Sequence, residues 1–292
     1  MSHKSGFVNI LGRPNVGKST LMNELVGEKL AIVTSKAQTT RHRIMGIISG
    51  ENFQIIYSDT PGILEPKYKL HELMMKSVSS AAFDADLVIY VTDVTWKAGE
   101  SHDFLYKFKN ENIPVLLIIN KVDLLKKQAV NRLTREWESM LPEAEIIPAS
   151  ALLRFNTDKI FERILELLPE GPPYYPKDTL TDRPERFFVS EIIRGKIILN
   201  YHKEIPYSVQ VEIESFKESD KLVKIRAIIY VLRDSQKGII IGHRGEALKK
   251  VGMEARTDIE KFLTKKVYLE LFVKVSKDWR NKERRLRSFG YR

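Results

Sequence analysis

None of the 292 residues is cysteine, and no hydrophobic run reaches the roughly 18–20 residues that a membrane-spanning helix needs. The lack of cysteine excludes disulfides, thiolate metal sites and a cysteine nucleophile. The six histidines have no metal-ligand spacing, so no zinc partner is predicted. The first residues also lack the pattern of a signal peptide. Together these absences favour a cytoplasmic protein.

An excess of positive charge is confined to one part of the chain. Residues 1–180 carry 22 Lys and Arg against 22 Asp and Glu, whereas residues 181–292 carry 26 against 16. The whole net charge of +10 therefore lies in the last part. This asymmetry predicts two modules with different partners, of which the second partner is a polyanion. The alternative is a solvated basic surface without a partner.

A glycine-containing loop follows the first apolar run. Residues 7–11 predict a buried strand, and residues 21–26 predict a helix that ends at Gly27. Between them lies a match to the phosphate-binding pattern GxxxxGK[ST]. Glycines let backbone N–H groups wrap a polyphosphate, Lys18 would reach the β- and γ-phosphates, and Ser19 would hold Mg²⁺. The predicted loop consists of Gly12, Arg13, Pro14, Asn15, Val16, Gly17, Lys18, Ser19 and Thr20.

A second polar motif follows the apolar residues 53–57 and consists of Asp59, Thr60, Pro61 and Gly62. A carboxylate at the end of a strand can hold Mg²⁺ through a water, which is the role expected of Asp59. Gly62 would let a backbone N–H meet the γ-phosphate. Taken alone, this motif is also compatible with an ordinary turn.

A third motif indicates which base the nucleotide carries. Residues 115–119 run into Asn120, Lys121 and Asp123. The Asp123 carboxylate can accept both N1–H and N2–H₂ of guanine, a pair of donors that adenine does not offer. The Lys121 stem can lie over the purine, and Asn120 can tie the base loop to the phosphate loop. Further along the chain, backbone N–H groups at Ser150 and Ala151 are candidates to receive the guanine O6.

Apolar strands alternate with helical segments through this first module. Besides those above, strands are predicted at residues 44–48, 87–91 and 145–147, and helices at 71–83, 102–110, 131–140 and 157–168. Such alternation predicts an α/β fold with a doubly wound, mostly parallel sheet. Ligands of such sheets lie beyond the carboxyl ends of the strands, where every motif above falls. The sequence therefore predicts a guanine-nucleotide site.

A proline-rich segment at residues 169–176 holds four prolines in eight residues and predicts an extended connector. We place the domain boundary near residue 178, with one domain at 1–178 and the other at 179–292. A long surface loop inside a single domain is the alternative.

The basic module contains a second glycine motif. Its predicted order is a helix at 184–194, strands at 208–214 and 222–232, a short apolar helix, a long helix around 248–262 and a strand at 267–275. A GxxG loop between the two later helices is the signature of a KH domain, whose loop clamps backbone nucleotides. The predicted RNA-binding residues are Gly238, Ile239, Ile240, Ile241, Gly242, His243, Arg244, Gly245 and Lys249, with the three isoleucines as a platform for bases. The basic tail after residue 276 would contact phosphates, dock on the sheet, or form a solvated helix anchored by Trp279.

The order α-β-β-α-α-β resembles the bacterial, type II KH fold, a smaller α+β domain. The motifs GRPNVGKS, DTPG, NKVD and SA resemble those of translation-factor-related, P-loop GTPases. By similarity, Thr40, or alternatively Thr39, would close on Mg²⁺ in the GTP state. The resemblance also matches Asn15 to the asparagine of GTPases that recruit K⁺ in catalysis. Catalytic residues by this resemblance are Asn15, Lys18, Thr40 and Gly62. Ile63 stands where Ras-like proteins have a water-orienting glutamine, which predicts slow hydrolysis.

Along its whole length the chain resembles the Era GTPases, including the string KAQTTRHR at residues 36–43 and LRSFGY at 286–291. That resemblance implies GTP and GDP as ligands, binding to the 3′ region of 16S ribosomal RNA, and a role in assembly of the 30S subunit. It also implies peripheral association with the inner face of the cell membrane, where anionic lipid would meet the basic half.

The main hypothesis is a GTP-controlled RNA-binding switch, in which GTP and Mg²⁺ order the loop at residues 34–43 and the segment after Gly62, and hydrolysis releases them. Two rival hypotheses stay open at this point. One is a constitutive RNA-binding scaffold whose GTPase is vestigial or only tunes its behaviour, and the other is an ATP-driven RNA remodeller.

Overall fold

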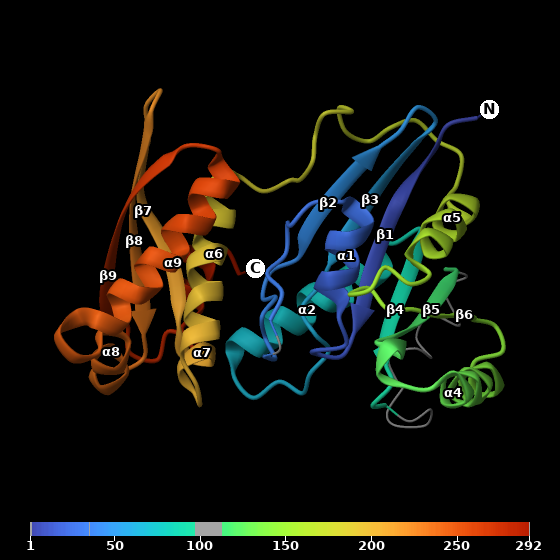
Figure 1. Cartoon of the computed structure of the whole chain (residues 1–292), viewed down its shortest axis with the longest axis horizontal. Coiled ribbons are helices and arrows are strands. Elements are labelled where there is room, and N and C mark those ends of the chain that lie inside the picture. Colours follow the sequence, from blue (N-terminus) through green and yellow to red (C-terminus); the bar gives the residue numbers. More distant parts are fainter. Residues whose placement is uncertain (1, 35, 97–112, 292) are drawn as a thin grey trace. The chain divides into compact units, whose positions relative to one another are not determined.

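The computed structural model describes residues 2–34, 36–96 and 113–291 (Figure 1). The chain forms two compact units. The first comprises residues 1–31, 40–65 and 74–182, and the second comprises residues 32–39, 66–73 and 183–292. Two short segments from the first half of the sequence therefore pack with the second unit. The predicted domain boundary near residue 178 stays a prediction.

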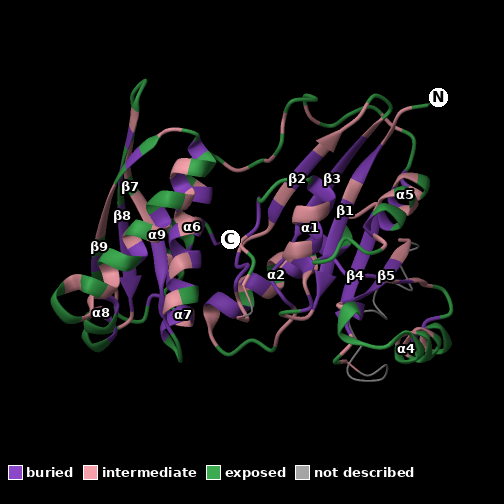
Figure 2. Ribbon diagram, viewed as in Figure 1, coloured by how far each residue is buried: buried purple, intermediate pink, exposed green. Residues whose placement is uncertain are grey.

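The first unit is built on a six-stranded sheet in the order β2-β3-β1-β4-β5-β6 (Figure 1). Only β2 runs antiparallel to its neighbour. The central strands are buried on both faces (Figure 2), which explains their continuous apolar runs. The predicted doubly wound, mostly parallel sheet is confirmed. Its strands are β1 (Lys4–Gly12), β2 (Ile44–Ser49), β3 (Phe53–Asp59), β4 (Leu87–Asp93), β5 (Val115–Asn120) and β6 (Glu145–Pro148).

Parallel pairing brings the polar strand ends to one edge of this sheet. Ile10 pairs with Asp59 across β1 and β3, and Asp93 pairs with Asn120 across β4 and β5. The loops that follow these strands therefore start from neighbouring points. This edge is where open α/β sheets bind ligands.

The helices connecting these strands are α1 (Lys18–Val26), α2 (Lys69–Phe83), α4 (Lys127–Met140) and α5 (Thr157–Leu167), with a 3₁₀ turn η2 at Val122–Leu124. The α4 helix begins four residues before the predicted start at 131, because its first three residues, at 127–129, are exposed and give no apolar periodicity. It anchors to the core through Trp137, which is fully buried. The helix predicted at residues 102–110 lies outside the described residues.

The second unit has a three-stranded sheet in the order β7-β8-β9, in which β7 and β8 are antiparallel and β8 and β9 are parallel. Apolar side chains of α6 and α9 pack with the strands in one core cluster. The predicted α-β-β-α-α-β domain is confirmed. Its elements are α6 (Glu185–Asn200), α7 (Ile205–Ser208), β7 (Gln210–Glu218), β8 (Leu222–Val231), α8 (Asp234–Ile241), η3 (His243–Gly245), α9 (Glu246–Leu263), β9 (Lys266–Val275) and α10 (Glu283–Ser288).

Helix α6 continues six residues beyond its predicted end at Arg194. The prediction stopped there because the next residue, Gly195, is a poor helix former. In the structure a Cβ on Gly195 would lie 3.1 Å from Cγ2 of Ile32, so the missing side chain lets the 32–39 segment approach the helix closely. Packing within the second unit therefore outweighs the low helix propensity of Gly195.

The basic C-terminal segment docks on the second unit. Trp279 is fully buried and its indole N–H donates to Ser208 O at 3.1 Å. Phe289 lies 5.3 Å from Tyr230 of β8, centroid to centroid, and the Arg285 guanidinium lies over the same tyrosine. Of the alternatives for the tail, the structure therefore has it docked, with Trp279 as its anchor. None of the helices in the described part of the chain is long and apolar enough to cross a membrane.

Candidate functional site

The predicted phosphate loop joins β1 to α1 and depends on two glycines with left-handed backbone. Gly12 has φ of 143°, and a Cβ there would lie 2.1 Å from Val91 O. Gly17 has φ of 97°, and its Cβ would lie 2.2 Å from Nδ2 of Asn120. Both positions combine positive φ with a close approach, so a side chain would displace the loop.

Lys18 is buried under this loop. Its ammonium donates to the backbone carbonyls of Gly12 at 3.1 Å and Arg13 at 2.8 Å. Burial lowers the pKa of Lys18 to about 8, although the nearby charge of Asp59 works to raise it. The structure thus places a buried cationic group directly inside the loop predicted to hold phosphates.

Three oxygen-bearing side chains from separate segments meet beside Lys18. Ser19 Oγ donates to Asp59 Oδ2 at 2.6 Å, Thr40 Oγ1 donates to the same oxygen at 3.0 Å, and the two hydroxyls are 2.9 Å apart. Thr39 instead bonds to Thr34 Oγ1 at 2.6 Å. The geometry therefore favours Thr40 over Thr39 as the predicted Mg²⁺ ligand.

The fit of this cluster to Mg²⁺ rests on its donor set. Two hydroxyls and one carboxylate are the hard oxygen ligands that Mg²⁺ prefers. Asp59 Oδ1 is buried and accepts no hydrogen bond from any described residue, so it is available to a metal-bound water. Burial raises the pKa of Asp59, against the charge of Lys18 and the bonds from Ser19 and Thr40. A bound cation would oppose that rise.

The segment after β3 lies against the phosphate loop. Thr60 Oγ1 donates to Ile10 O at 2.8 Å, and Ile63 N donates to Gly12 O at 3.0 Å. A Cβ on Gly62 would lie 2.7 Å from the Pro14 ring and backbone, so only glycine fits there. Gly62 is therefore adjacent to the phosphate loop, as its predicted role requires.

The base loop, residues 120–123, is tied to the phosphate loop through Asn120. Its Nδ2 donates to Val16 O at 2.8 Å, as the sequence predicted, and its Oδ1 accepts from Ala151 N at 3.0 Å. Ser150 Oγ donates to Asp123 Oδ1 at 2.5 Å. The predicted guanine-binding groups are thus brought together. Because Ala151 N is already engaged by Asn120, contact with the guanine O6 would require that N–H to serve two acceptors.

Lys121 makes a second link between the loops. Its ammonium donates to Asn15 O at 2.5 Å and to Asp93 Oδ2 at 2.6 Å. Asp93 was not among the predicted site residues. Its signal in the sequence is weak, since it is one carboxylate at the end of an apolar strand, but its register opposite Asn120 places it in the site.

The second predicted site surrounds the GxxG loop between α8 and α9. Gly242 has φ of 73°, and a Cβ there would lie 2.6 Å from Cβ of Ala247. Gly245 has φ of 82°, and nothing lies within 4 Å of the position of its Cβ. His243, Arg244 and, one turn further, Lys249 are exposed. The loop therefore presents cationic and hydrogen-bonding side chains on a tight backbone.

The apolar residues before this loop have different environments. Ile239 is 50% exposed, Ile240 is 0% exposed and belongs to the core, and Ile241 is intermediate. The Ile240 carbonyl accepts from Tyr201 Oη at 2.6 Å. The predicted three-isoleucine platform is thus corrected by helical geometry: Ile240 faces inward, and Ile239 is the residue that faces solvent. Gly238 is exposed on the same helix.

A groove of about 570 Å³ extends from the GxxG loop between α9 and β9. Lys249 lines it, as do three residues that sequence reasoning missed: Met253, Arg256 and Tyr268. Tyr268 is 54% exposed and offers an aromatic face. Spacing along α9 could have found Met253 and Arg256, which follow Lys249 by four and seven residues on one helix face. Tyr268 requires knowledge of how β9 packs. The remaining lining residues are Gly245, Leu248, Gly252, Val267, Leu269 and Leu271.

Residues 7–121 match the family model described as 50S ribosome-binding GTPase, and residues 204–280 match the KH domain. The chain is 47% identical over 291 residues to GTPase Era of Staphylococcus haemolyticus, covering 99% of this chain and 97% of that protein. The chain belongs to the Era GTPase family. GTPase Era of Geotalea daltonii is also 47% identical, over 98% of this chain and 97% of its own.

Two solved structures of the Era family share the fold across both units. One is a variant of Aquifex aeolicus Era bound to GDP and AlF₄⁻, and the other is Era with MgGDPNP and nucleotides 1506–1542 of 16S ribosomal RNA. Each has a TM-score of 0.95, 40% identity and 99% coverage of both chains. The family predicted from the sequence is confirmed.

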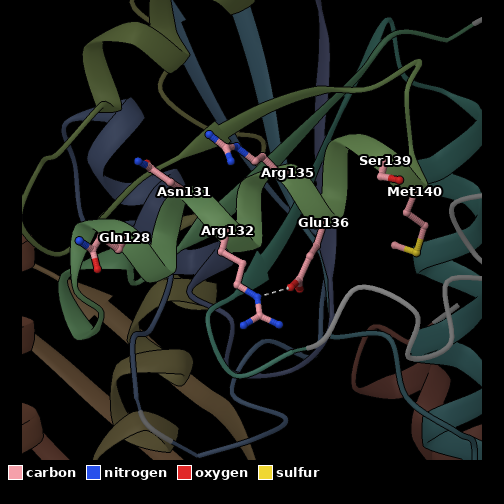
Figure 3. Close-up of a pocket in the computed structure, with 7 residues that line it drawn as sticks. All are labelled: Gln128, Asn131, Arg132, Arg135, Glu136, Ser139 and Met140. Carbon is pink, nitrogen blue, oxygen red and sulfur yellow. Dashed lines mark hydrogen bonds and ion pairs between the residues drawn. The ribbon is translucent and has the colours of Figure 1, made fainter.

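A separate hollow of about 940 Å³ lies along α4 (Figure 3). The side chains in view belong to one helix, and the bond drawn among them joins Arg132 to Glu136 one turn away, at 3.0 Å. It contains none of the residues predicted for nucleotide or RNA. We assign no Era-family site to it.

Proposed function

We propose that this protein binds GTP with Mg²⁺, hydrolyses it to GDP and phosphate, and binds the 3′ region of 16S ribosomal RNA during assembly of the 30S subunit. The nucleotide part of this proposal rests on the convergence of Ser19, Thr40 and Asp59. The hydrogen bond that ties the base loop to the phosphate loop supports it further. The GxxG loop and its groove support the RNA part, together with the RNA held by the similar Era structure.

Each residue of the nucleotide site has a role that its position supports. Lys18 would exchange its two carbonyl partners for the β- and γ-phosphates. Ser19 and Thr40 would bind Mg²⁺ directly, and Asp59 would bind it through a water. Mg²⁺, when bound, supplies positive charge to the phosphate oxygens. Asp123 would accept the guanine edge, and Ser150 would hold that carboxylate in place.

Hydrolysis is expected to be slow, because Ile63 offers no side chain that can orient water. We propose that a K⁺ ion near Asn15 supplies part of the missing charge stabilisation. Asn15 has φ of 67° and is exposed on the phosphate loop, which supports access for an ion.

The nucleotide assignment is tested by Asp123→Asn. An asparagine amide offers a donor where guanine needs an acceptor, so GTP affinity should fall by roughly a hundredfold. Xanthosine triphosphate (XTP) carries a carbonyl oxygen in place of the amino group of guanine. It should therefore bind the variant better than it binds the unaltered protein. Titrations of GTP, XTP and ATP on both proteins measure this. Unchanged GTP affinity, or comparable binding of ATP, would overturn a guanine site.

The RNA assignment is tested with an oligonucleotide of the 16S 3′ end. Gly242→Asp places a carboxylate and a Cβ on a crowded, left-handed residue of the clamp, so RNA binding should be lost while GTP binding remains. A scrambled oligonucleotide is the control for sequence preference. If the variant still bound the RNA, the RNA site would have to lie elsewhere than the GxxG loop.

A hydrogen-bonded connection within the second unit supports control of RNA binding by nucleotide. Lys36 donates to Ile198 O and Tyr201 O at the end of α6, each at 2.5 Å. Tyr201 Oη in turn donates to Ile240 O, two residues before Gly242. Arg194 donates to Thr39 O, and Thr40 is the next residue. The loop predicted to respond to GTP is thus connected to the helix that leads into the RNA clamp.

A further inference from the structure

Asp93 is a buried carboxylate at the carboxyl end of β4 for which the mechanism above has no role. Its side chain is 5% exposed, and its backbone pairs in register with Asn120 on β5. A carboxylate this far from water needs partners, and one of the two residues that bond to it, Lys121, belongs to the nucleotide site.

Both oxygens of the Asp93 carboxylate are engaged. Oδ1 accepts from Thr95 N at 3.0 Å and from Thr95 Oγ1 at 2.5 Å. Oδ2 accepts from Lys121 Nζ at 2.6 Å. Thr95 therefore fixes the orientation of the carboxylate, and the carboxylate in turn fixes the position of the ammonium.

The ammonium of Lys121 also donates to Asn15 O on the phosphate loop. Lys121 thus spans from its own backbone in the base loop to the phosphate loop, with its stem stretched between two fixed ends. A lysine stem alone is flexible and its charge is strongly hydrated, so it holds one conformation only when the ammonium is anchored. The left-handed backbone of Lys121, with φ of 61°, further directs the stem.

The protonation state of Asp93 agrees with this arrangement. Burial works to raise the pKa of Asp93, but the hydrogen bonds from Lys121 and Thr95 outweigh it and hold the pKa below its ordinary value. The carboxylate is therefore ionised at neutral pH and remains an anion for the lysine.

We propose that Asp93 is a positioning residue for guanine-nucleotide binding, which holds the Lys121 stem across the purine site and the base loop against the phosphate loop. This inference rests on the proposed nucleotide function. Asp93 does not touch the nucleotide in this proposal and acts only through Lys121.

The consequence concerns how long the nucleotide stays bound. The Lys121 side chain is 34% exposed even with this ion pair made. Without the Asp93 anion its ammonium can turn to water, so the stem would leave the purine and one of the two links between the loops would weaken. The rate of GDP dissociation should rise roughly tenfold, the effect expected when a bond to a charged group is lost.

The test measures GDP dissociation by fluorescence from the full chain carrying Asp93→Asn, Lys121→Ala, or both changes. If Asp93 acts through Lys121, Asp93→Asn speeds dissociation about tenfold in the original background and leaves it unchanged in the Lys121→Ala background. Asp86→Asn is the matched control. Asp86 lies just before the amino end of β4 and accepts a bond from Phe7 N, so it should leave dissociation unchanged.

A second variant keeps the test informative if Asp93→Asn does not fold. Thr95→Val removes one donor to the carboxylate but retains the ion pair, and it should raise the dissociation rate by a smaller factor that also vanishes with Lys121→Ala. The inference would be overturned if the effects of Asp93→Asn and Lys121→Ala on the dissociation rate multiplied in the double variant. It would also be overturned if Asp93→Asn alone left the rate within twofold of the original. A chain that binds no GDP at all would instead overturn the proposed function.

Discussion

Lys18 is a cation held out of water by the loop that it serves. Burial lowers its pKa to about 8, so in the absence of nucleotide its charge is partly lost just above neutral pH. A polyphosphate beside the ammonium favours the charged form and raises that pKa. Binding of nucleotide is therefore coupled to uptake of a proton.

The sign of this coupling is testable by calorimetry. At pH 8 about half of the free protein lacks the Lys18 proton, so binding GDP should take up about half a proton, and affinity should fall as pH rises above 8. Titration in two buffers of different ionisation enthalpy measures the uptake. At pH 7, where Lys18 is mostly charged already, uptake should drop to about a tenth of a proton. Identical heats in both buffers at pH 8 would contradict the lowered pKa.

Asn15 is the residue at which the proposed role of K⁺ can be tested. Steady-state GTP turnover should be several-fold faster in K⁺ than in Na⁺ buffer, because K⁺ fits a coordination site that the smaller ion does not. Asn15→Ala should remove the difference while GDP affinity changes little. Equal turnover of the unaltered protein in the two salts would refute this role.

At the scale of elements, local sequence signals placed most helices and strands but misjudged their ends. Helix α4 starts before its apolar pattern does, and α6 continues through Gly195 because Ile32 packs where a side chain would be. Ile240 shows the same limit within a short helix, where three consecutive isoleucines cannot share a face. In each case the outcome depends on what lies against the helix.

The docked C-terminal segment makes a prediction about stability. Trp279→Ala would open a large cavity and leave Ser208 O without its donor, costing about 3–5 kcal/mol of the free energy of unfolding. Denaturant unfolding of the full chain, with Trp279→Phe as the milder control, measures the loss. If the segment served only as an RNA-binding arm, the free energy of unfolding would not change and RNA affinity alone would fall.

At the scale of the whole molecule, the question is whether nucleotide and RNA affect each other's binding. The residue 32–39 segment packs with the RNA-binding unit, while the next residue, Thr40, contacts Ser19 and Asp59. Four residues of continuous chain therefore separate Thr40 from Lys36, which bonds to the end of α6, and this is the route by which a change at Thr40 would reach the helix.

Lys36→Met tests this coupling, since it retains the apolar stem but loses both bonds to the end of α6. The ratio of RNA affinities between the GTP-analogue and GDP states should fall toward one, and RNA should lose its effect on nucleotide affinity by the same factor. Lys29→Met, at an exposed lysine near the start of the same loop, is the matched control. Equal RNA affinity of the unaltered protein in every nucleotide state would favour the constitutive scaffold.

The sequence alone predicted which residues make up both proposed sites. Each motif, namely GxxxxGK[ST], a carboxylate at a strand end, or GxxG, places its groups within a single loop. Covalent geometry sets the spacing of those groups, so Lys18, Asp123 and Gly242 could be predicted without a structure. The alternation of strands and helices likewise determined the fold class.

Only the tertiary structure decided which groups from different segments meet. It brought Thr40 rather than Thr39 to Ser19 and Asp59, added Asp93 and Tyr268, and turned Ile240 inward. These outcomes depend on strand register and on packing between segments far apart in sequence. Neither leaves a periodic or local pattern in the chain, which is why the sequence could not supply them.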